Sequence, residues 1–332
     1  MKKALLLLCL LAFCLSGCQK TDFAETEIFA MDTVMNIKIW SEDASSHVSD
    51  VTQIINSYER TFSATRATSE ISMLNSGADI SLSEDTLALL QEAISLSDLT
   101  DGSFDPTVLP LISLWGFRED PPSAFSEVQL KLDETITHIG TEHIHINGFS
   151  VTLDSGCGID LGGIAKGYAA QNCATQLREK GITAALLSLG GNVQTVGTKP
   201  DGSSWIIGIA DPEQPSRAIA KLTFQGSLAL VTSGAYQRYV EIDGKVYHHI
   251  LDPKTGYPAN SGLASVTILA ENGTLADGLS TALFVMGLEK GTEFWKDSKD
   301  FEAIFITQDR QIFITEGVES MISGCEFTVI RK

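Results

Sequence analysis

The sequence predicts an α+β fold with mostly antiparallel sheets, built as two closely packed α+β subdomains. Strand-like and helix-like patterns occur in blocks, without the regular strand–helix alternation that would favour a doubly wound parallel sheet. Apolar residues make up 43% of the 332 residues, enough for a sizeable core. No Pro/Gly/Ser-rich linker divides the chain, so we expect residues 28–332 to form a single domain.

Up to about Lys180, the chain is predicted to begin with a strand and to continue mainly as helices. Residues 31–40 alternate apolar and polar side chains, as a half-buried strand does. Residues 45–60 and 84–99 have helical patterns, and Ser83 is the expected N-cap of the second. Residues 104–122 are rich in proline and aromatic side chains, which indicates a loop packed on the body. The remaining elements are strands at 143–146 and 150–153 and a helix that runs from the Gly-rich segment 156–163 to about Lys180, where Gly181 ends it.

From residue 184 onward, the chain is predicted to be rich in strands that glycine or proline turns separate. Helical patterns occur only at 274–286 and 289–297. The predicted strands cover residues 184–189, 205–209, 219–224, 228–232, 237–242, 245–250, 263–270, 302–307, 312–315 and 326–331.

The N-terminal residues have the features of a secretory signal. A basic start is followed by an apolar run at 4–15, which is shorter than a membrane-spanning helix. Leu15-Ser16-Gly17-Cys18 resembles a bacterial lipobox. This resemblance implies that residues 1–17 are a lipoprotein signal peptide and that Cys18 is lipidated. Residues 18–27 would then tether the domain to a bacterial membrane, on its periplasmic or extracellular side. An ordinary signal peptide with an incidental cysteine is the alternative.

The charge of the chain excludes nucleic acid as a partner. The sequence has 42 acidic residues against 23 Lys and Arg, a formal net charge of −19, and no basic run that could neutralise phosphates. The cysteines outside the signal region, Cys157, Cys173 and Cys325, are odd in number and include no CxxC pair. They predict neither a disulfide framework nor a zinc site, and we expect three buried thiols, although one bridge is possible.

A Gly-rich segment from Asp154 to Tyr168 follows a strand and opens a helix, where free N–H groups and the helix dipole attract anions. Lys166 lies in the first turn of this helix, within reach of a phosphate. The spacing of the glycines matches neither the dinucleotide fingerprint nor the P-loop. Because the free N–H groups and Lys166 still favour an anion, we predict that this segment binds phosphate through another arrangement of glycines. The alternative is a tight strand–helix connection with a surface lysine.

Two adjacent histidines, His248 and His249, precede an Asp-Pro-x-Thr-Gly turn. Neighbouring residues of a strand face opposite sides, so at most one imidazole can point into a given site. They are therefore not a paired metal ligand, but one of them could serve as an acid–base group. Otherwise the segment is only a well-specified turn.

Asp277 and Thr281 lie four residues apart in a helical pattern, so they share one helix face. Carboxylate and hydroxyl oxygens suit Mg²⁺, and the alternative is a capping and solvation pair. Ser233 lies in neither a G-x-S-x-G nor an S-x-x-K pattern, which disfavours a serine hydrolase.

Taken in order, the motifs resemble the bacterial ApbE family of FAD:protein FMN transferases, formerly called thiamine biosynthesis lipoproteins. The resemblance covers essentially the whole chain after the signal. Its motifs are Met31-Asp-Thr, Ser69-Glu-Ile-Ser-Met-Leu-Asn75, Phe104-Asp-Pro-Thr107, Asp160 to Tyr168, Gly190-Gly-Asn192, Thr232-Ser-Gly234, His249 to Gly256, and Asp277-x-x-x-Thr281.

The resemblance implies a Mg²⁺-dependent enzyme that cleaves FAD, attaches FMN through a phosphoester to a Thr or Ser of an acceptor protein, and releases AMP. It implies that His249 and Asp277 are catalytic, with His249 activating the acceptor hydroxyl, and that Gly163, Asp277 and Thr281 hold the metal. The residues expected to contact FAD are Met31, Ser103, Phe104, Asp105, Asp160, Lys166 and Ile250.

The family also suggests the partner. No segment of this chain matches the family's acceptor pattern, so the expected acceptor is another protein, typically a subunit of a membrane Nqr- or Rnf-type electron-transport complex. Asp32 replaces the family's usual Gly, and Thr65 replaces a frequent Tyr, and both changes bear on FAD affinity. Two alternatives stay open: an FAD pyrophosphatase that yields FMN and AMP, and a flavin- or solute-binding lipoprotein without catalytic activity.

Overall fold

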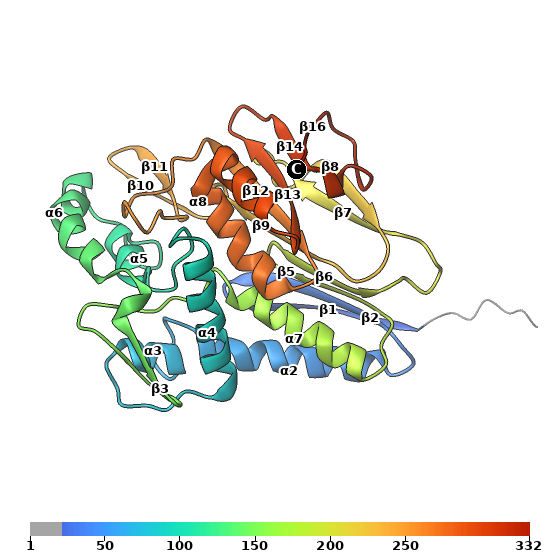
Figure 1. Ribbon diagram of the computed structural model, residues 1–332. Helices are drawn as coiled ribbons and strands as arrows, with labels where there is room; N and C mark the ends of the chain where they lie inside the picture. The colour runs from blue at the N-terminus through green and yellow to red at the C-terminus, as the bar shows by residue number, and fades with distance from the viewer. Residues whose placement is uncertain (1–21) are drawn as a thin grey trace, which may run out of the picture.

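The computed structural model describes residues 22–332 (Figure 1). The predicted signal peptide, the lipidation site Cys18 and the start of the tether lie outside the described residues.

A nine-stranded sheet forms the centre of the molecule, in the order β1-β2-β5-β6-β9-β12-β13-β14-β16. Its neighbours pair antiparallel except β14 and β16, which pair parallel. The predicted α+β class with mostly antiparallel pairing is therefore confirmed. The strands are β1 (Phe23–Ala30), β2 (Thr33–Trp40), β5 (Ala184–Leu189), β6 (Asn192–Gly197), β9 (Ala229–Gly234), β12 (Leu263–Ala270), β13 (Phe301–Thr307), β14 (Ile312–Thr315) and β16 (Thr328–Ile330).

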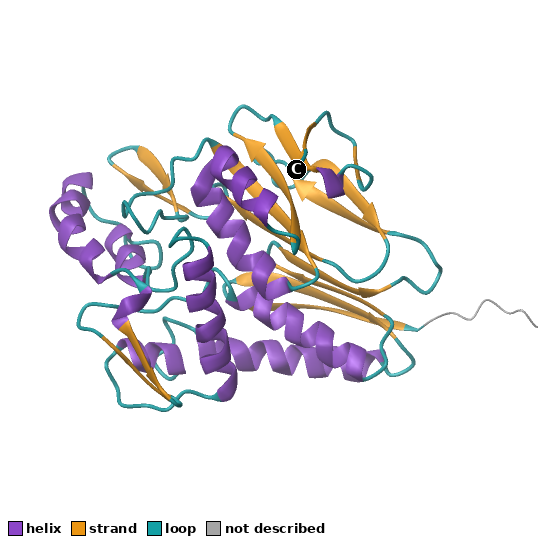
Figure 2. Cartoon of the chain, viewed as in Figure 1, coloured by secondary structure: helices purple, strands orange, loops and turns teal. Residues whose placement is uncertain are grey.

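Helices α2 (Ala44–Phe62), α7 (Ala165–Glu179) and α8 (Gly273–Asp297) cover one face of this sheet, and a small sheet covers part of the other, while the remaining helices lie farther from the sheet (Figures 1 and 2). The remaining helices are α3 (Glu70–Asn75), α4 (Glu84–Leu99), α5 (Leu109–Trp115) and α6 (Phe125–Thr135). The smaller sheets are β15-β8-β7 (Ile322–Ser323, Ala218–Phe224, Trp205–Ala210), the hairpin β3-β4 (Ile144–Asn147, Ser150–Leu153) and the hairpin β10-β11 (Tyr239–Ile242, Lys245–His248).

Two parts of the chain, termed here its first half (residues 22–197) and its second half (residues 229–332), meet in the middle of the central sheet. Strands β1, β2, β5 and β6 come from the first half, and the strands from β9 onward come from the second. The β6–β9 seam joins them through three residue pairs, Asn192↔Val231, Val193↔Leu230 and Gln194↔Ala229. Helices α7 and α8, one from each half, pack against each other beside this seam (Figure 1).

Glycine allows α7 and α8 to touch through their backbones. A Cβ on Gly167 would lie 2.3 Å from the carbonyl oxygen of Gly273 and 2.6 Å from the Cβ of Asp277. No larger residue fits at this crossing without moving a helix. The contact brings the first turn of α7 directly against the first turns of α8.

Several predicted boundaries were wrong. The predicted tether is too long, because β1 begins at Phe23; its alternating exposed residues, such as Glu25 and Glu27, mark an edge strand rather than a polar linker. The predicted loop 104–122 contains helix α5, whose first turn accommodates Pro110. Strand β6 was not predicted, because buried Gln194 and Thr195 interrupt its apolar pattern. The short helices α3 and α6 were also not predicted.

Two other predictions are confirmed. The helical patterns at 274–286 and 289–297 form one element with a break at Gly287, which has the non-helical angles φ 80°, ψ 177°. The thiols of Cys157, Cys173 and Cys325 are free, although Cys325 is only half-buried.

Candidate functional site

A cavity of about 900 Å³ opens where the two halves of the chain meet. This volume is at the upper end of the range typical of small-molecule sites. Every site residue predicted within the described part of the chain lines it: Met31, Ser103, Phe104, Asp105, Asp160, Gly163, Lys166, His249, Ile250, Asp277 and Thr281. The fold thus brings together segments that are separated by more than two hundred positions.

Asp277 is held on the floor of the cavity by contacts from the other half of the chain. Its carboxylate is 4% exposed and accepts hydrogen bonds from the N–H of Gly167 at 2.8 Å and from Nδ2 of Asn192 at 3.2 Å. Burial raises the pKa of Asp277, and the charge of Lys166 opposes this shift. A buried carboxylate in this state is stabilised by a nearby cation.

Three hydroxyl groups form a cluster between β9 and the part of α8 that carries Asp277. Ser233 Oγ lies 2.7 Å from Ser280 Oγ and 3.2 Å from Thr281 Oγ1, and Ser280 donates to the carbonyl of Asp277 at 2.8 Å. Gly163 is adjacent, since a Cβ there would lie 3.7 Å from Thr281 Oγ1. The hydrogen bonds of Ser233 Oγ among the described residues are to these two hydroxyls and not to a histidine, so a serine hydrolase stays disfavoured.

These oxygens fit a hard divalent cation. A carboxylate, a hydroxyl and a backbone carbonyl are the donor types that Mg²⁺ accepts, usually with several waters retained. Asn192 Oδ1, next to Asp277, is buried and has no hydrogen-bond partner among the described residues. Within residues 22–332, no three His, Cys, Asp or Glu side chains are arranged to hold a metal, so binding here would depend on this mixed oxygen set.

The Gly-rich segment contributes the cation of Lys166 and a hydrogen-bonded turn at Asp160–Gly162 to the cavity. Asp160 is buried, accepts the N–H of Gly162 at 2.7 Å and forms an ion pair with Arg118. Lys166 donates to the carbonyl of Gly162 at 3.1 Å and lies in the first turn of α7. Asp160 is therefore part of a buried charge pair, which sequence reasoning did not anticipate.

Asp105 stabilises the loop between α4 and α5, which also lines the cavity. Its Oδ1 accepts the backbone N–H of Thr107 at 2.8 Å as well as the Thr107 hydroxyl. Burial raises its pKa, and the hydrogen bonds from Thr107 oppose this shift. The ring of neighbouring Phe104 lies against Gly163, where a Cβ would be 3.2 Å from Cε2.

The two histidines face opposite sides, as predicted. His248 bonds the carbonyl of Ala259 at 3.1 Å and packs edge-on against Phe284 in the interior. His249 lines the cavity, and its Nδ1 lies 3.1 Å from the carbonyl oxygen of Arg238. Because a carbonyl only accepts, Nδ1 carries the proton and Nε2 is the acceptor.

Burial lowers the pKa of His249 to about 4, and the positive charges of Arg238 and Lys166 act in the same direction. The imidazole is therefore neutral at physiological pH. It can accept a proton at Nε2, although as a weak base.

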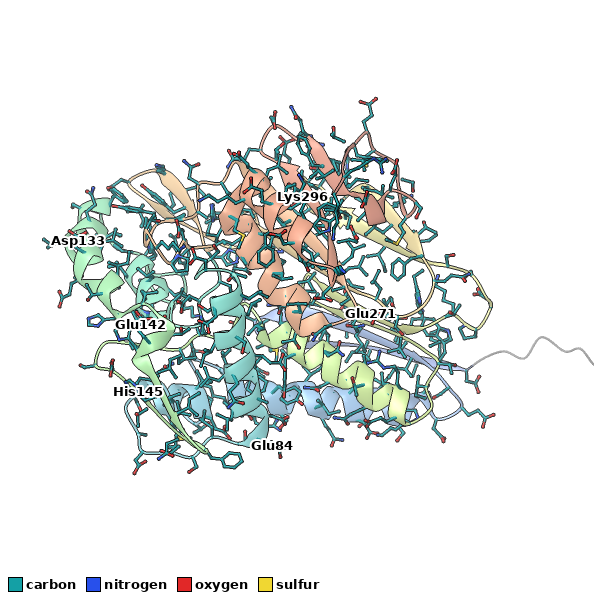
Figure 3. All side chains as sticks on the ribbon, viewed as in Figure 1. Glu84, Asp133, Glu142, His145, Glu271 and Lys296 are labelled. Atoms are coloured by element: carbon teal, nitrogen blue, oxygen red, sulfur yellow. The ribbon has the colours of Figure 1, made fainter. Side chains whose placement is uncertain are left out.

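The cavity differs in charge from the rest of the molecule. Acidic side chains such as Glu84, Asp133 and Glu271 are exposed and do not line it (Figure 3). Four cationic side chains line it alongside five carboxylates, whereas the whole chain has nearly two acids per base. Sequence reasoning identified only one of these cations, Lys166, and missed Arg66, Arg118 and Arg238.

None of the helices in residues 22–332 is long and apolar enough to cross a membrane.

Comparisons with known proteins agree on one family. The model of the ApbE family matches residues 31–305. A FAD:protein FMN transferase of Vibrio cholerae is 35% identical over 288 residues, which cover 83% of this chain and 86% of that protein. The solved ApbE protein of Thermotoga maritima has a TM-score of 0.82 and 32% identity, over 90% of this chain and 99% of that one. The flavin transferase ApbE from Vibrio cholerae has a TM-score of 0.78 and 30% identity, with the same coverage.

Proposed function

The chain belongs to the ApbE family and is a FAD:protein FMN transferase, and from this premise we propose a specific reaction. The enzyme uses Mg²⁺ to transfer FMN from FAD to a Thr or Ser hydroxyl of an acceptor protein, and AMP is released. The observation that carries this proposal is the meeting of three groups in one cavity: the oxygens around Asp277, the ammonium of Lys166 and the neutral imidazole of His249.

Asp277, Thr281 and the backbone oxygen of Gly163 would hold the metal. When bound there, Mg²⁺ supplies positive charge that offsets the charge of the FAD pyrophosphate. The N–H of Gly167 and the amide of Asn192 fix the carboxylate of Asp277 in place.

FAD would occupy the cavity around this floor. Lys166 provides a cation beside the phosphates, and Met31, Ile250 and Phe104 provide apolar contact area. Ser103, Asp105 and Asp160 are the remaining expected contacts. Because Asp160 is paired with Arg118 and Asp105 with Thr107, both carboxylates keep their positions before FAD arrives.

His249 would take the proton of the acceptor hydroxyl. The acceptor oxygen forms a bond to the FMN phosphorus, the phosphorus–oxygen bond to the AMP half breaks, and the hydroxyl proton moves to Nε2 of His249. The hydrogen bond from Nδ1 to the carbonyl of Arg238 keeps Nε2 free for this role. A positioned base of this kind contributes about 10²- to 10⁴-fold.

We further propose where the enzyme acts. Lipidation of Cys18 would hold it at a bacterial membrane, on the periplasmic or extracellular side, near an Nqr- or Rnf-type acceptor subunit. Replacing Cys18 by Ser should release the protein from the membrane fraction. Retention in that fraction would contradict the anchor.

The reaction is tested by incubation with FAD, Mg²⁺ and a co-expressed acceptor subunit, followed by mass spectrometry of the acceptor. We expect added FMN on one Thr or Ser and an equal amount of AMP. AMP with free FMN and an unmodified acceptor would identify an FAD pyrophosphatase instead. Unchanged FAD after long incubation would identify a binding protein without catalytic activity.

A further inference from the structure

The β1–β2 hairpin ends in an unusual turn at the rim of the cavity. Met31 and Asp32 are its two central residues, with φ of 47° and 59°, and both line the cavity. A two-residue turn with both φ positive favours Asn-Gly, because other residues adopt left-handed angles at a cost of about 1–2 kcal/mol each. A contact from elsewhere in the fold offsets part of this cost.

That contact comes from Arg238, 206 positions away in the sequence. Its Nη2 donates to the carbonyl oxygen of Asp32 at 3.3 Å, and its Nη1 lies 3.8 Å from the Asp32 carboxylate. Both side chains are well exposed, so the pair is weak and exchangeable.

Arg238 also connects to the reacting groups. It directly precedes β10, and its backbone carbonyl accepts both the N–H and the Nδ1–H of His249, each at 3.1 Å. The charges of Arg238 and of Lys166 both act on this imidazole. Arg238 itself lines the cavity proposed to hold FAD.

Most of the donors of Arg238 are unused. A guanidinium has five N–H donors in a planar fork that matches phosphate. Among the described residues, the only hydrogen bond from this side chain is the one to Asp32. An anionic ligand in the cavity has an available cation here, and Asp32 is its present counter-ion.

We propose that Arg238 binds the pyrophosphate of FAD, and that Asp32 restrains this arginine and competes with FAD for it. The inference rests on the proposed function, since it takes FAD as the ligand of the cavity. It adds a second cation to Lys166, and it makes the hairpin tip a determinant of FAD affinity.

Equilibrium binding of three probes tests this assignment without any turnover, in EDTA. Riboflavin carries the flavin ring alone, ADP carries the pyrophosphate alone, and FAD carries both. In Arg238→Gln we expect the Kd of FAD and of ADP to rise about tenfold, whereas the Kd of riboflavin stays within twofold. Arg238→Lys should recover part of the loss, because it restores the charge but not the fork.

Asp32→Asn tests the competition. Asparagine tolerates the left-handed angles and removes only the charge, so we expect the Kd of FAD to fall about three- to tenfold at low salt and the gain to shrink in 0.5 M NaCl. In the Asp32→Asn/Arg238→Gln double variant this gain should vanish. Glu241→Gln is the matched control, because it removes a charge from β10 outside the cavity and should leave the Kd unchanged.

Three results would overturn the assignment: unchanged FAD binding in Arg238→Gln, an equal loss of riboflavin binding, or a full Asp32→Asn gain in the double variant. Wild-type protein that binds FAD but shows one of these results refutes this inference alone. Wild-type protein that binds FAD neither in EDTA nor in the presence of Mg²⁺ refutes the proposed function as well.

Discussion

The floor and the rim of the cavity are built on different principles. At the floor, Asp277 is buried and held by a backbone N–H where two helices touch through glycine. At the rim, Asp32 and Arg238 are exposed and meet at 3.3 and 3.8 Å. The fold therefore fixes the oxygens expected to hold the metal, while it leaves the groups that meet the incoming substrate adjustable. Substitutions at the floor should therefore have the larger effects.

The largest expected effect is the loss of turnover in Asp277→Ala. Without the only acidic oxygen among the proposed metal ligands, we expect the Mg²⁺-dependent rate of AMP release to fall by at least about 10³-fold. The fold should persist, because the carboxylate is buried at a cost that the higher pKa of Asp277 reflects. Glu271→Ala, an exposed acid just before α8, is the control. A rate within tenfold of wild type would contradict the metal assignment.

Gly167→Ala should destabilise the fold more than any rim substitution. The added Cβ would lie 2.3 Å from a backbone oxygen of α8, so the two helices must separate, at a cost of about 3 kcal/mol in unfolding free energy. Urea unfolding measures this change. Gly181→Ala, where φ is 78° but no atom lies within 4 Å of the new Cβ, should cost only about 1 kcal/mol. Equal losses in both variants would show that the helix contact is not specially tight.

His249→Gln tests the proposed proton acceptor, which lines the cavity next to Arg238. We expect transfer to the acceptor to slow about 10²-fold, while FAD affinity changes less than threefold. In the wild type, kcat should stay level as the pH falls from 7 and be lost as it passes through about 4, where His249 becomes protonated. His248→Gln, on the opposite side of the strand, should leave kcat within fivefold. A wild-type acid limb near pH 6.5 would show that His249 is not desolvated.

Asp32→Gly should have the smallest effect on stability, and a favourable one. Glycine adopts a φ of 59° without steric cost, so we expect the unfolding free energy to rise by up to about 1 kcal/mol. Asp243 offers the comparison, since it also has a positive φ, of 51°, but its carboxylate accepts the N–H of Phe125 at 2.9 Å. Asp243→Gly should therefore give no gain. Destabilisation by Asp32→Gly would mean that the ion pair between the Asp32 carboxylate and Arg238 contributes more to stability than the left-handed backbone of Asp32 costs.

The floor could be predicted from sequence because its residues carry local patterns. The four-residue spacing of Asp277 and Thr281 and the glycines before Lys166 each indicate chemistry within one short segment. The resemblance to one family placed these segments in a common site, and the cavity contains all of them.

The cationic groups of the cavity wall and rim could not be predicted in this way. Arg118 and Arg238 are single residues without a motif, and their partners, Asp160 and Asp32, are distant in the sequence. Strand β1 was mistaken for a linker for a related reason, because an edge strand buries only part of its surface and its exposed positions resemble polar chain. Contacts between segments that are distant in the sequence become visible only in the folded structure.

The candidate site is complete only when the two halves of the chain are paired across the β6–β9 seam. Lys166 and Asn192 come from one half of the chain, whereas His249, Asp277 and Thr281 come from the other, and three residue pairs between β6 and β9 join the two halves. Neither half alone contains a binding site, so a ligand that spans the seam stabilises only the fully docked molecule. At a hundredfold excess over its Kd, that ligand adds about 2.7 kcal/mol. Substrate supply would then set not only the rate of this enzyme but also the length of time it survives proteolysis.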